Sequence, residues 1–382
     1  MDFVLISKEH AQATREKVRA GKGIWDEVAF GLRKSGEAAM EKGPWSVTFA
    51  SRTAPSGNPH DYFSEGPYWW PNPEDPDGPY IRRDGLIYPG RFDEHHSDFG
   101  NLSNAVLDLV NAGYYLEDEK YLDRAACLLN VWFVDEATRM NPNMRYGQGI
   151  KGHCDGRCIG LIELTAADKV AHALGFLSEY EKYAATVAGV KKWMNEFLDW
   201  LLIPDGFGWE ELRHGNNHSG WCVVHAMYFA ALNDREDVVR MLADFYKESI
   251  LEQIEPDGSM PLELARTRSY HYSLYGMIPM VLTCELARKY GIDLWECENS
   301  KGGSLRKAAE FMYPYMENPF AWPYEQIVGD HADDILFYQY AAARLNEPKY
   351  AEVNRKRREG FKYIRNQNPM GPLCLLEGEF LI

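Results

Sequence analysis

Two short segments of this 382-residue chain carry side chains that could remove a proton and offset a negative charge. In residues 213–221, Asn216, Asn217 and His218 stand where a helical pattern begins. One interpretation is structural: Asn217 or Ser219 caps the helix, and His218 is a polar residue of its first turn. The other is chemical, because side chains at a helix N-terminus lie beside free backbone N–H groups that favour an anion. The residue types leave both interpretations open.

The second segment, residues 263–275, combines arginines with several tyrosines. If it is helical, four of its residues lie near one face: Arg266, Ser269, Tyr270 and Ser273. An ordinary helix with solvated arginines and tyrosines in the core explains the same pattern. The spacing alone does not select Tyr272 over its neighbours Tyr270 and Tyr275 as a chemical group.

Helical periodicity dominates the rest of the chain and must position these groups. The predicted helices cover residues 8–20, 24–41, 102–115, 119–133, 160–178, 180–202, 218–232, 235–253, 273–290, 303–316, 329–345 and 348–364. Short connections between them indicate antiparallel helix hairpins. The sequence therefore predicts an all-α fold, an (α/α) toroid built as an incomplete helical barrel, and the absence of a fixed period disfavours a regular solenoid.

Residues 51–100 interrupt the helical pattern with eight prolines and the aromatic run Tyr68-Trp69-Trp70. A flexible linker would not carry such an aromatic cluster. Long irregular segments inside compact proteins are often binding loops. We therefore expect one domain over residues 1–382, with 51–100 as an inserted loop on the substrate side.

Composition and charge exclude several classes of protein. The net charge is −16 and no long Lys/Arg run occurs, so a nucleic-acid partner is not expected. No apolar stretch reaches the length of a membrane span, which is about 18 to 20 residues. No signal peptide is recognised, which predicts a cytoplasmic protein as written, or a periplasmic or secreted one if a signal peptide was removed. A monomer or weak homo-oligomer is expected.

Three blocks of residues resemble the alginate lyase superfamily. The stretch Asn216-Asn217-His218-Ser219, followed by Arg-x-x-Ser-x-x-Tyr over residues 266–272, is similar to its active-site pair. The upstream runs at residues 66–73 and 80–85 resemble its substrate-side loop. Nothing after residue 300 reads as the appended β-sandwich of the two-domain members. The chain is therefore most similar to the single-domain (α/α) toroid lyases, such as polysaccharide lyase families 5 and 38.

The resemblance implies β-elimination on a 1,4-linked polyuronate, either alginate rich in mannuronate or glucuronan, without a cofactor or metal. Asn217 and Arg266 would offset the charge of the uronate carboxylate and of the intermediate. Tyr272 would be the acid, and His218 would be the base or would lower the pKa of the tyrosine. The candidate substrate-binding residues are Tyr68, Trp69, Trp70, Arg82, Arg83, His95, His96, Asn216 and Tyr270.

Two other functions remain open. A glycoside hydrolase on the same fold would need two carboxylates across a cleft, and the available acids are Glu210, Glu211, Asp333 and Asp334. A non-catalytic protein that binds acidic polysaccharide is the other. Residues 153–158 lack the second ligand pair that a structural zinc site usually needs. The cluster at residues 330–334 reads as a helix N-terminus with acids in its first turn rather than a metal site.

Overall fold

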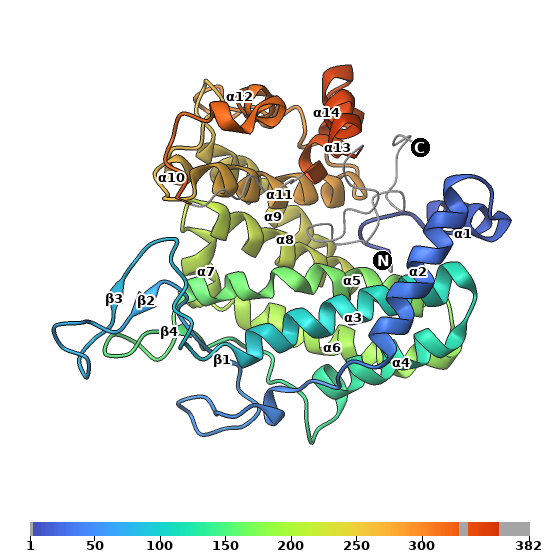
Figure 1. Cartoon of the computed structure of the whole chain (residues 1–382), viewed down its shortest axis with the longest axis horizontal. Helices are drawn as coiled ribbons and strands as arrows, with labels where there is room; N and C mark the ends of the chain where they lie inside the picture. The colour runs from blue at the N-terminus through green and yellow to red at the C-terminus, as the bar shows by residue number, and fades with distance from the viewer. Residues whose placement is uncertain (1–2, 328–334, 359–382) are drawn as a thin grey trace.

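The structure is a computed structural model that describes residues 3–327 and 335–358. It is mostly helical, as predicted (Figure 1). The α-helices are α1 (Lys8–Ala20), α2 (Ile24–Met40), α3 (Glu94–Leu116), α4 (Glu119–Leu129), α5 (Ala167–Leu177), α6 (Ala184–Leu201), α7 (Phe207–Leu212), α8 (Asn217–Leu232), α9 (Glu236–Phe245), α10 (Pro261–Leu264), α11 (Ser269–Arg288), α12 (Leu305–Glu317), α13 (Ile335–Arg344) and α14 (Pro348–Arg358).

The helices pack both on their neighbours in the chain and on more distant helices. Helix α3 contacts α2, α4 and α5, and α8 contacts α6, α7, α9 and α11. Helices α8 and α11 are buried on nearly all sides, which is the pattern of helices inside a core. One apolar cluster extends from Phe3 to Val353. The surrounding core therefore fixes where α8 and α11 begin. The first turns of these two helices carry most of the predicted catalytic groups.

Several element boundaries differ from the predicted ones. Helix α3 begins at Glu94 instead of residue 102, so the inserted loop ends at Asp93. Helix α11 begins at Ser269 instead of residue 273. A 3-10 segment, η3 (Cys158–Ala166), precedes α5 where one continuous helix was expected. The cluster at residues 330–334 lies outside the described residues. The single domain over the whole chain stays a prediction, because residues 359–382 are also outside them.

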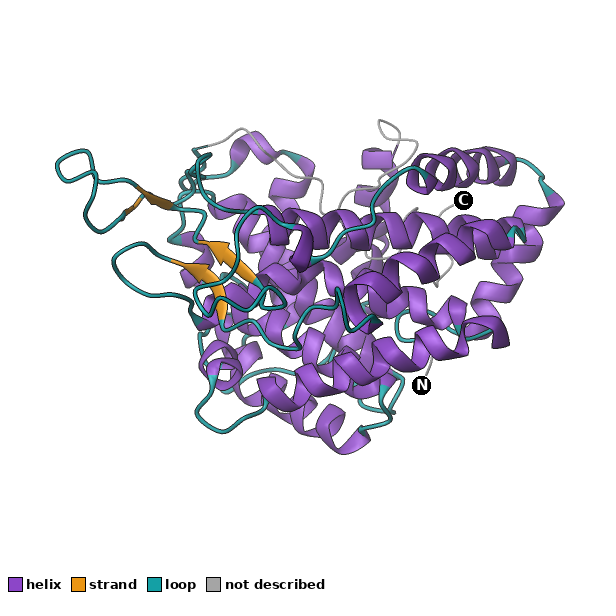
Figure 2. Cartoon of the chain, turned by 90° about the horizontal axis from the view of Figure 1, so that it is seen from below, coloured by secondary structure: helices purple, strands orange, loops and turns teal. Residues whose placement is uncertain are grey.

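The inserted loop folds into short strands at one end of the helical body (Figure 2). Strand β1 (Phe63–Glu65) pairs in parallel with β4 (Tyr146–Gly149), and β2 (Trp69–Trp70) pairs antiparallel with β3 (Ile81–Arg82). Two hydroxyls anchor the loop to η3: Tyr62 and Ser64 donate hydrogen bonds of 2.7 and 2.5 Å to the buried carboxylate of Glu163. The part of the loop just before the aromatic run is therefore held against η3 and is not a linker.

None of the helices in the described part of the chain has both the length and the apolar character that crossing a membrane requires.

Candidate active site

The first turn of α8 carries three of the predicted site residues. Its N-cap is Asn216, whose side-chain oxygen accepts a hydrogen bond of 3.0 Å from the backbone N–H of His218. The predicted caps, Asn217 and Ser219, have other roles. Ser219 Oγ accepts a hydrogen bond from Gly215 N–H and donates one to the Glu211 carbonyl. Because Asn216 caps the helix, Asn217 and His218 are free to make contacts outside it.

His218 is oriented by a buried carboxylate. Its Nδ1 lies 2.7 Å from Oε1 of Glu211, a residue at the end of α7 that is 0 % exposed. The ring of His214 lies beside it, with centroids 5.3 Å apart. Burial, followed by the proximity of His218, lowers the pKa of His214. Glu211 is therefore a positioning residue for the histidine.

Asn217 is held by a second buried carboxylate. Its Nδ2 lies 2.9 and 3.0 Å from the two carboxylate oxygens of Glu263, and its backbone N–H donates to Oε1 at 2.7 Å. Burial raises the pKa of Glu263, although the hydrogen bonds from Asn217 and the proximity of Arg266 and His218 oppose that rise. Glu263 thus lies within the electrostatic reach of Arg266 and His218 and joins α8 to α10.

Arg266 does not lie on a helix face with Ser269, Tyr270 and Ser273, contrary to the prediction. It sits in the turn between α10 and α11, because α10 ends at Leu264 and α11 begins only at Ser269. From that turn its guanidinium lies 3.7 Å from the centroid of the Tyr272 ring. The turn lets the arginine fold back over the tyrosine of the following helix.

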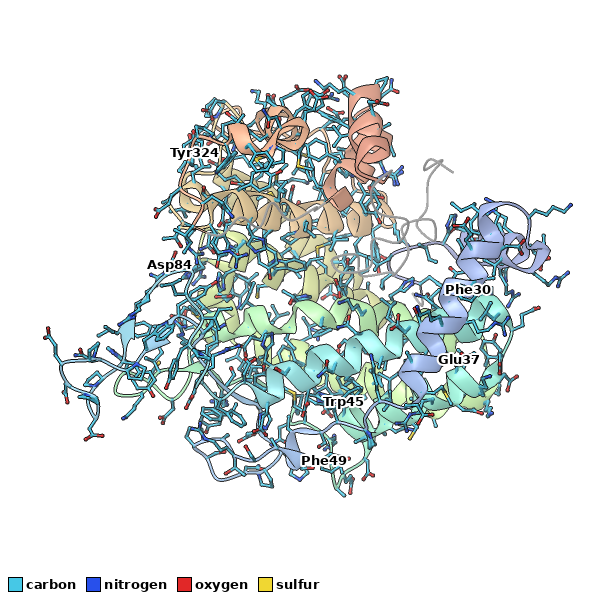
Figure 3. All side chains as sticks on the ribbon, in the orientation of Figure 1. Phe30, Glu37, Trp45, Phe49, Asp84 and Tyr324 are labelled. Atoms are coloured by element: carbon cyan, nitrogen blue, oxygen red, sulfur yellow. The ribbon has the colours of Figure 1, made fainter. Side chains whose placement is uncertain are left out.

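The inserted loop reaches Arg266 through Asp84. Arg266 donates from Nε and Nη2 to the two oxygens of Asp84 at 3.1 and 3.0 Å, and Arg82 donates to the same carboxylate at 2.7 Å. Figure 3 labels Asp84 where the loop meets the helices. Burial acts to raise the pKa of Asp84, but the hydrogen bonds and charges of Arg266 and Arg82 outweigh it and lower that pKa to about 2.

Tyr272 is the tyrosine that the site brings together with Arg266. Its hydroxyl shares a hydrogen bond of 2.5 Å with the hydroxyl of Tyr68 from the loop. Burial, followed by the proximity of Tyr68, raises the pKa of Tyr272 well above its ordinary value. Tyr270 was predicted to bind substrate, and this is wrong. It is 0 % exposed, and its hydroxyl points into the core toward Met316.

The loop residues separate into two groups. Tyr68 and Trp69 lie against the site, and the Trp69 ring packs at 4.9 Å from the ring of His153. Trp70 instead packs inside the hairpin, where its indole N–H donates to the Leu86 carbonyl and the Arg83 guanidinium lies 5.1 Å from its ring. Structural contacts within the loop thus account for Trp70 and Arg83.

His95 and His96 belong to the first turn of α3 and not to the loop. The prediction that His95 contacts substrate is wrong: it is 0 % exposed, and its Nδ1 accepts a hydrogen bond from the backbone N–H of Phe63. Burial lowers its pKa to about 4, so the ring is neutral. His96 is partly exposed and its Nδ1 lies 3.2 Å from Asp93. Burial acts to lower the pKa of His96, but Asp93 raises it overall.

Sequence reasoning missed four residues that complete the site. Glu211, Glu263 and Asp84 hold His218, Asn217 and Arg266, as described above. The fourth is Arg157, whose guanidinium is 6.0 Å from the Trp69 ring. Glu211 stands two residues before Arg213, and Glu263 stands three residues before Arg266. This closeness to the two motifs was the signal that could have identified them. Asp84 has no local signal, because its partner Arg266 is far away in the sequence, and the same holds for Arg157 and Trp69.

The comparisons with known proteins agree with this fold. The sequence model of the alginate lyase family matches residues 46–322. The chain is 30% identical to an alginate lyase from Bacteroides ovatus, with a TM-score of 0.88 and coverage of 98% of both chains. It also resembles alginate lyase A1-III from Sphingomonas species A1, with a TM-score of 0.60, 19% identity and coverage of 98% of this chain and 97% of that one. The predicted (α/α) toroid is thereby confirmed.

A curated relative adds a shorter match. A polysaccharide lyase of Stenotrophomonas maltophilia (strain K279a) is 33% identical over 88 residues, which is 23% of this chain and 26% of that protein. The chain thus matches only about a quarter of that relative's length. The family model, in contrast, matches most of the chain, and the Bacteroides ovatus structure matches nearly all of it. The protein accordingly belongs to the alginate lyase family of polysaccharide lyases.

Proposed function

We propose that the protein cleaves a 1,4-linked polyuronate, either mannuronate-rich alginate or glucuronan, by β-elimination that leaves an unsaturated uronate at the new end. One observation carries the proposal: the Arg266 guanidinium lies 3.7 Å from the Tyr272 ring centroid, and the Tyr272 hydroxyl shares a hydrogen bond with the Tyr68 hydroxyl. A cationic donor and a phenolic proton donor at one point match what an elimination next to a carboxylate needs.

The first requirement is neutralisation of charge. The C5–H of a uronate is a very weak acid while the adjacent carboxylate is charged, and proton removal adds a second negative charge. Donors fixed before the reaction stabilise such charge most strongly. Arg266 is fixed by Asp84 and Asn217 by Glu263. We assign the substrate carboxylate to the space in front of this pair.

The second requirement is proton transfer. The raised pKa of Tyr272 keeps its hydroxyl protonated, which suits an acid that protonates the leaving C4 oxygen. In β-mannuronate and β-glucuronate the C5 hydrogen and the C4 oxygen leave from the same side, so one tyrosine can remove the first proton and return it. Arg266 would favour its phenolate form in that step. In α-guluronate they leave from opposite sides, and His218 would then be the base opposite Tyr272.

The geometry disfavours a glycoside hydrolase. Glu211 is fully buried and bonded to His218, so its carboxylate does not face a sugar. Glu263 is equally buried and bonded to Asn217. Asp333 and Asp334 lie outside the described residues. A non-catalytic binding role would not require buried carboxylates that orient a histidine and an amide.

We expect the protein to act as a monomer or weak homo-oligomer, which sedimentation would measure.

The test uses polymannuronate, polyguluronate and glucuronan as substrates and the ultraviolet absorbance of the C4=C5 unsaturated uronate as the signal. Absorbance should rise on mannuronate or glucuronate polymers, and Tyr272→Phe should abolish the rise. Tyr180→Phe, between α5 and α6, is the matched control and should leave the rate unchanged. Reducing ends without ultraviolet absorbance would identify a hydrolase and reject the proposal. No product on any polymer would also reject it.

A further inference from the structure

Two hydrogen bonds to Gln148 hold the guanidinium of Arg157 in place. It lies between β4 and η3, where Nε donates to the Gln148 carbonyl at 3.0 Å and Nη2 donates to the Gln148 side-chain oxygen at 2.9 Å. Within residues 3–327 and 335–358, no carboxylate lies within ion-pair distance of it. Burial lowers the pKa of this guanidinium, although the nearby Cys154 and Glu163 act against that shift. A partly buried cation that forms no ion pair is costly, and its guanidinium is therefore suited to an anion supplied from outside.

The surroundings of Arg157 are built to hold it in one orientation. Gln148 is 5 % exposed and adopts a left-handed backbone conformation with φ 49°, which is uncommon for a residue with a side chain. Its backbone N–H donates to Ser64 Oγ, which in turn donates to the buried Glu163. On the loop side, a Cβ at Gly66 would lie 2.9 Å from Arg157 Nη2. Glycine at this position leaves the guanidinium room in its present orientation.

Arg157 lies next to the catalytic groups but not among them. Its guanidinium is 6.0 Å from the ring of Trp69, the neighbour of Tyr68 in the loop. On the other side its charge contributes, after burial and His218, to the lowered pKa of His214, whose ring touches that of His218. The guanidinium is therefore close to Trp69 of the loop and within electrostatic reach of His214, which precedes α8.

We propose that Arg157 binds the carboxylate of the uronate adjacent to the one that reacts, on the side of Trp69 and His214. A guanidinium has five N–H groups, and Gln148 uses two of them. The remaining N–H groups of Nη1 and Nη2 form the edge with which arginine binds a carboxylate through two hydrogen bonds. Each sugar of a polyuronate carries one carboxylate, so a second fixed arginine can bind the carboxylate of a second sugar. This inference rests on the proposed function.

The test compares Arg157→Gln with Arg145→Gln, which removes the same charge from an exposed position in the same segment. Each enzyme is assayed on a polyuronate and on the same polymer with a fraction of its carboxyl groups reduced to alcohols. Arg157→Gln should raise KM by about tenfold or more and leave kcat within about twofold. Reduction of the polymer should raise KM by a smaller factor for this variant than for the wild type and Arg145→Gln.

A purely structural role for Arg157 gives a different result. If Arg157→Gln only lowers the melting temperature, with KM and the response to carboxyl reduction equal to those of Arg145→Gln, the inference is overturned. Arg157→Lys keeps the charge and is used if the glutamine variant does not fold. The KM of Arg157→Lys should lie above the wild-type value. An unchanged KM for Arg157→Lys also overturns the inference. Absence of cleavage by the wild type on every polyuronate rejects the proposed function instead, so the two failures are distinct.

Discussion

The buried carboxylate of Glu211 accepts a hydrogen bond from Nδ1 of His218 at 2.7 Å. An ionised carboxylate can only accept, so the contact places a proton on Nδ1 and leaves Nε2 as the acceptor of a neutral ring. The glutamate reaches this position because α7 ends just before α8 begins, and Ser219 ties the two together through the Glu211 carbonyl. The pair therefore fixes both the tautomer and the direction of the histidine.

Replacement of this glutamate tests that role. In Glu211→Gln the amide can present either N–H or oxygen to His218, so the tautomer is no longer fixed. On a substrate for which His218 is the base, kcat should fall by about 10²-fold with a small change in KM. Glu210→Gln, an exposed neighbour, is the control. Steady-state rates of unsaturated product measure the effect, and equal rates for the two variants would show that the pairing does not contribute to catalysis.

The contact between Glu263 and Asn217 leads to a second prediction. Glu263→Gln brings an amide N–H₂ against the N–H₂ of Asn217, so one of the two must turn away. We expect kcat/KM to fall at least tenfold, and the free energy of unfolding to fall by about 1–3 kcal/mol, the cost of a buried polar group that loses its partner. Product formation and urea unfolding measure the two effects. Lower stability with unchanged kcat/KM would limit Glu263 to a structural role.

The candidate catalytic residues are easier to find in the sequence than the residues that hold them. Asn217, His218, Arg266 and Tyr272 stand in short contiguous motifs, so their types and order are visible in the chain. Asp84 is 182 residues from Arg266, and Glu263 is 46 residues from Asn217. Such pairs form only after the toroid closes, and no local pattern encodes them.

The wrong predictions have one physical cause, which is that residue type does not reveal burial. Tyr270 and His95 are polar aromatics of the kind that line a sugar cleft, yet both lie in the core. His95 was also predicted in the loop but lies in a helix, because α3 begins at Glu94, eight residues before the apolar periodicity becomes clear. Helix periodicity found most of the helices, but it missed the short helices α7 and α10 and could not place the first turn of a helix whose start is polar.

Tyr68 should control the pH range of the reaction through Tyr272. Its hydroxyl, after burial, raises the pKa of Tyr272. If Tyr272 acts as the acid, activity is lost as the pH rises through that pKa. Tyr68→Phe removes part of the upward shift, so the alkaline limb of the kcat profile should move to lower pH. A profile over the alkaline range on polyguluronate, where Tyr272 would act as the acid alone, measures this, with Tyr88→Phe in the same loop as the control. An unchanged or upward-shifted limb would contradict the prediction.

Asp84 should make the docking of the inserted loop sensitive to acid. Its pKa is lowered from 3.8 to about 2, chiefly by the hydrogen bonds and charge of Arg266 acting against burial. A carboxyl with a lowered folded-state pKa stabilises the folded protein above its unfolded-state pKa, and this contribution is lost as the pH falls through the folded-state pKa. The stabilisation, at most about 2 kcal/mol, should therefore be present above about pH 4 and disappear toward about pH 2.

The measurement is urea unfolding of the wild type and Asp84→Asn at several pH values across that window. At neutral pH Asp84→Asn should be the less stable of the two, because the asparagine amide cannot pair with Arg266 as a charge. The difference should shrink as the pH falls, because acid protonates Asp84 in the wild type. Asp77→Asn, at an exposed position of the same loop, should differ little from the wild type at any pH. A difference between the wild type and Asp84→Asn that stays constant down to the lowest pH would mean that Asp84 stabilises the loop by shape and not by its charge on Arg266.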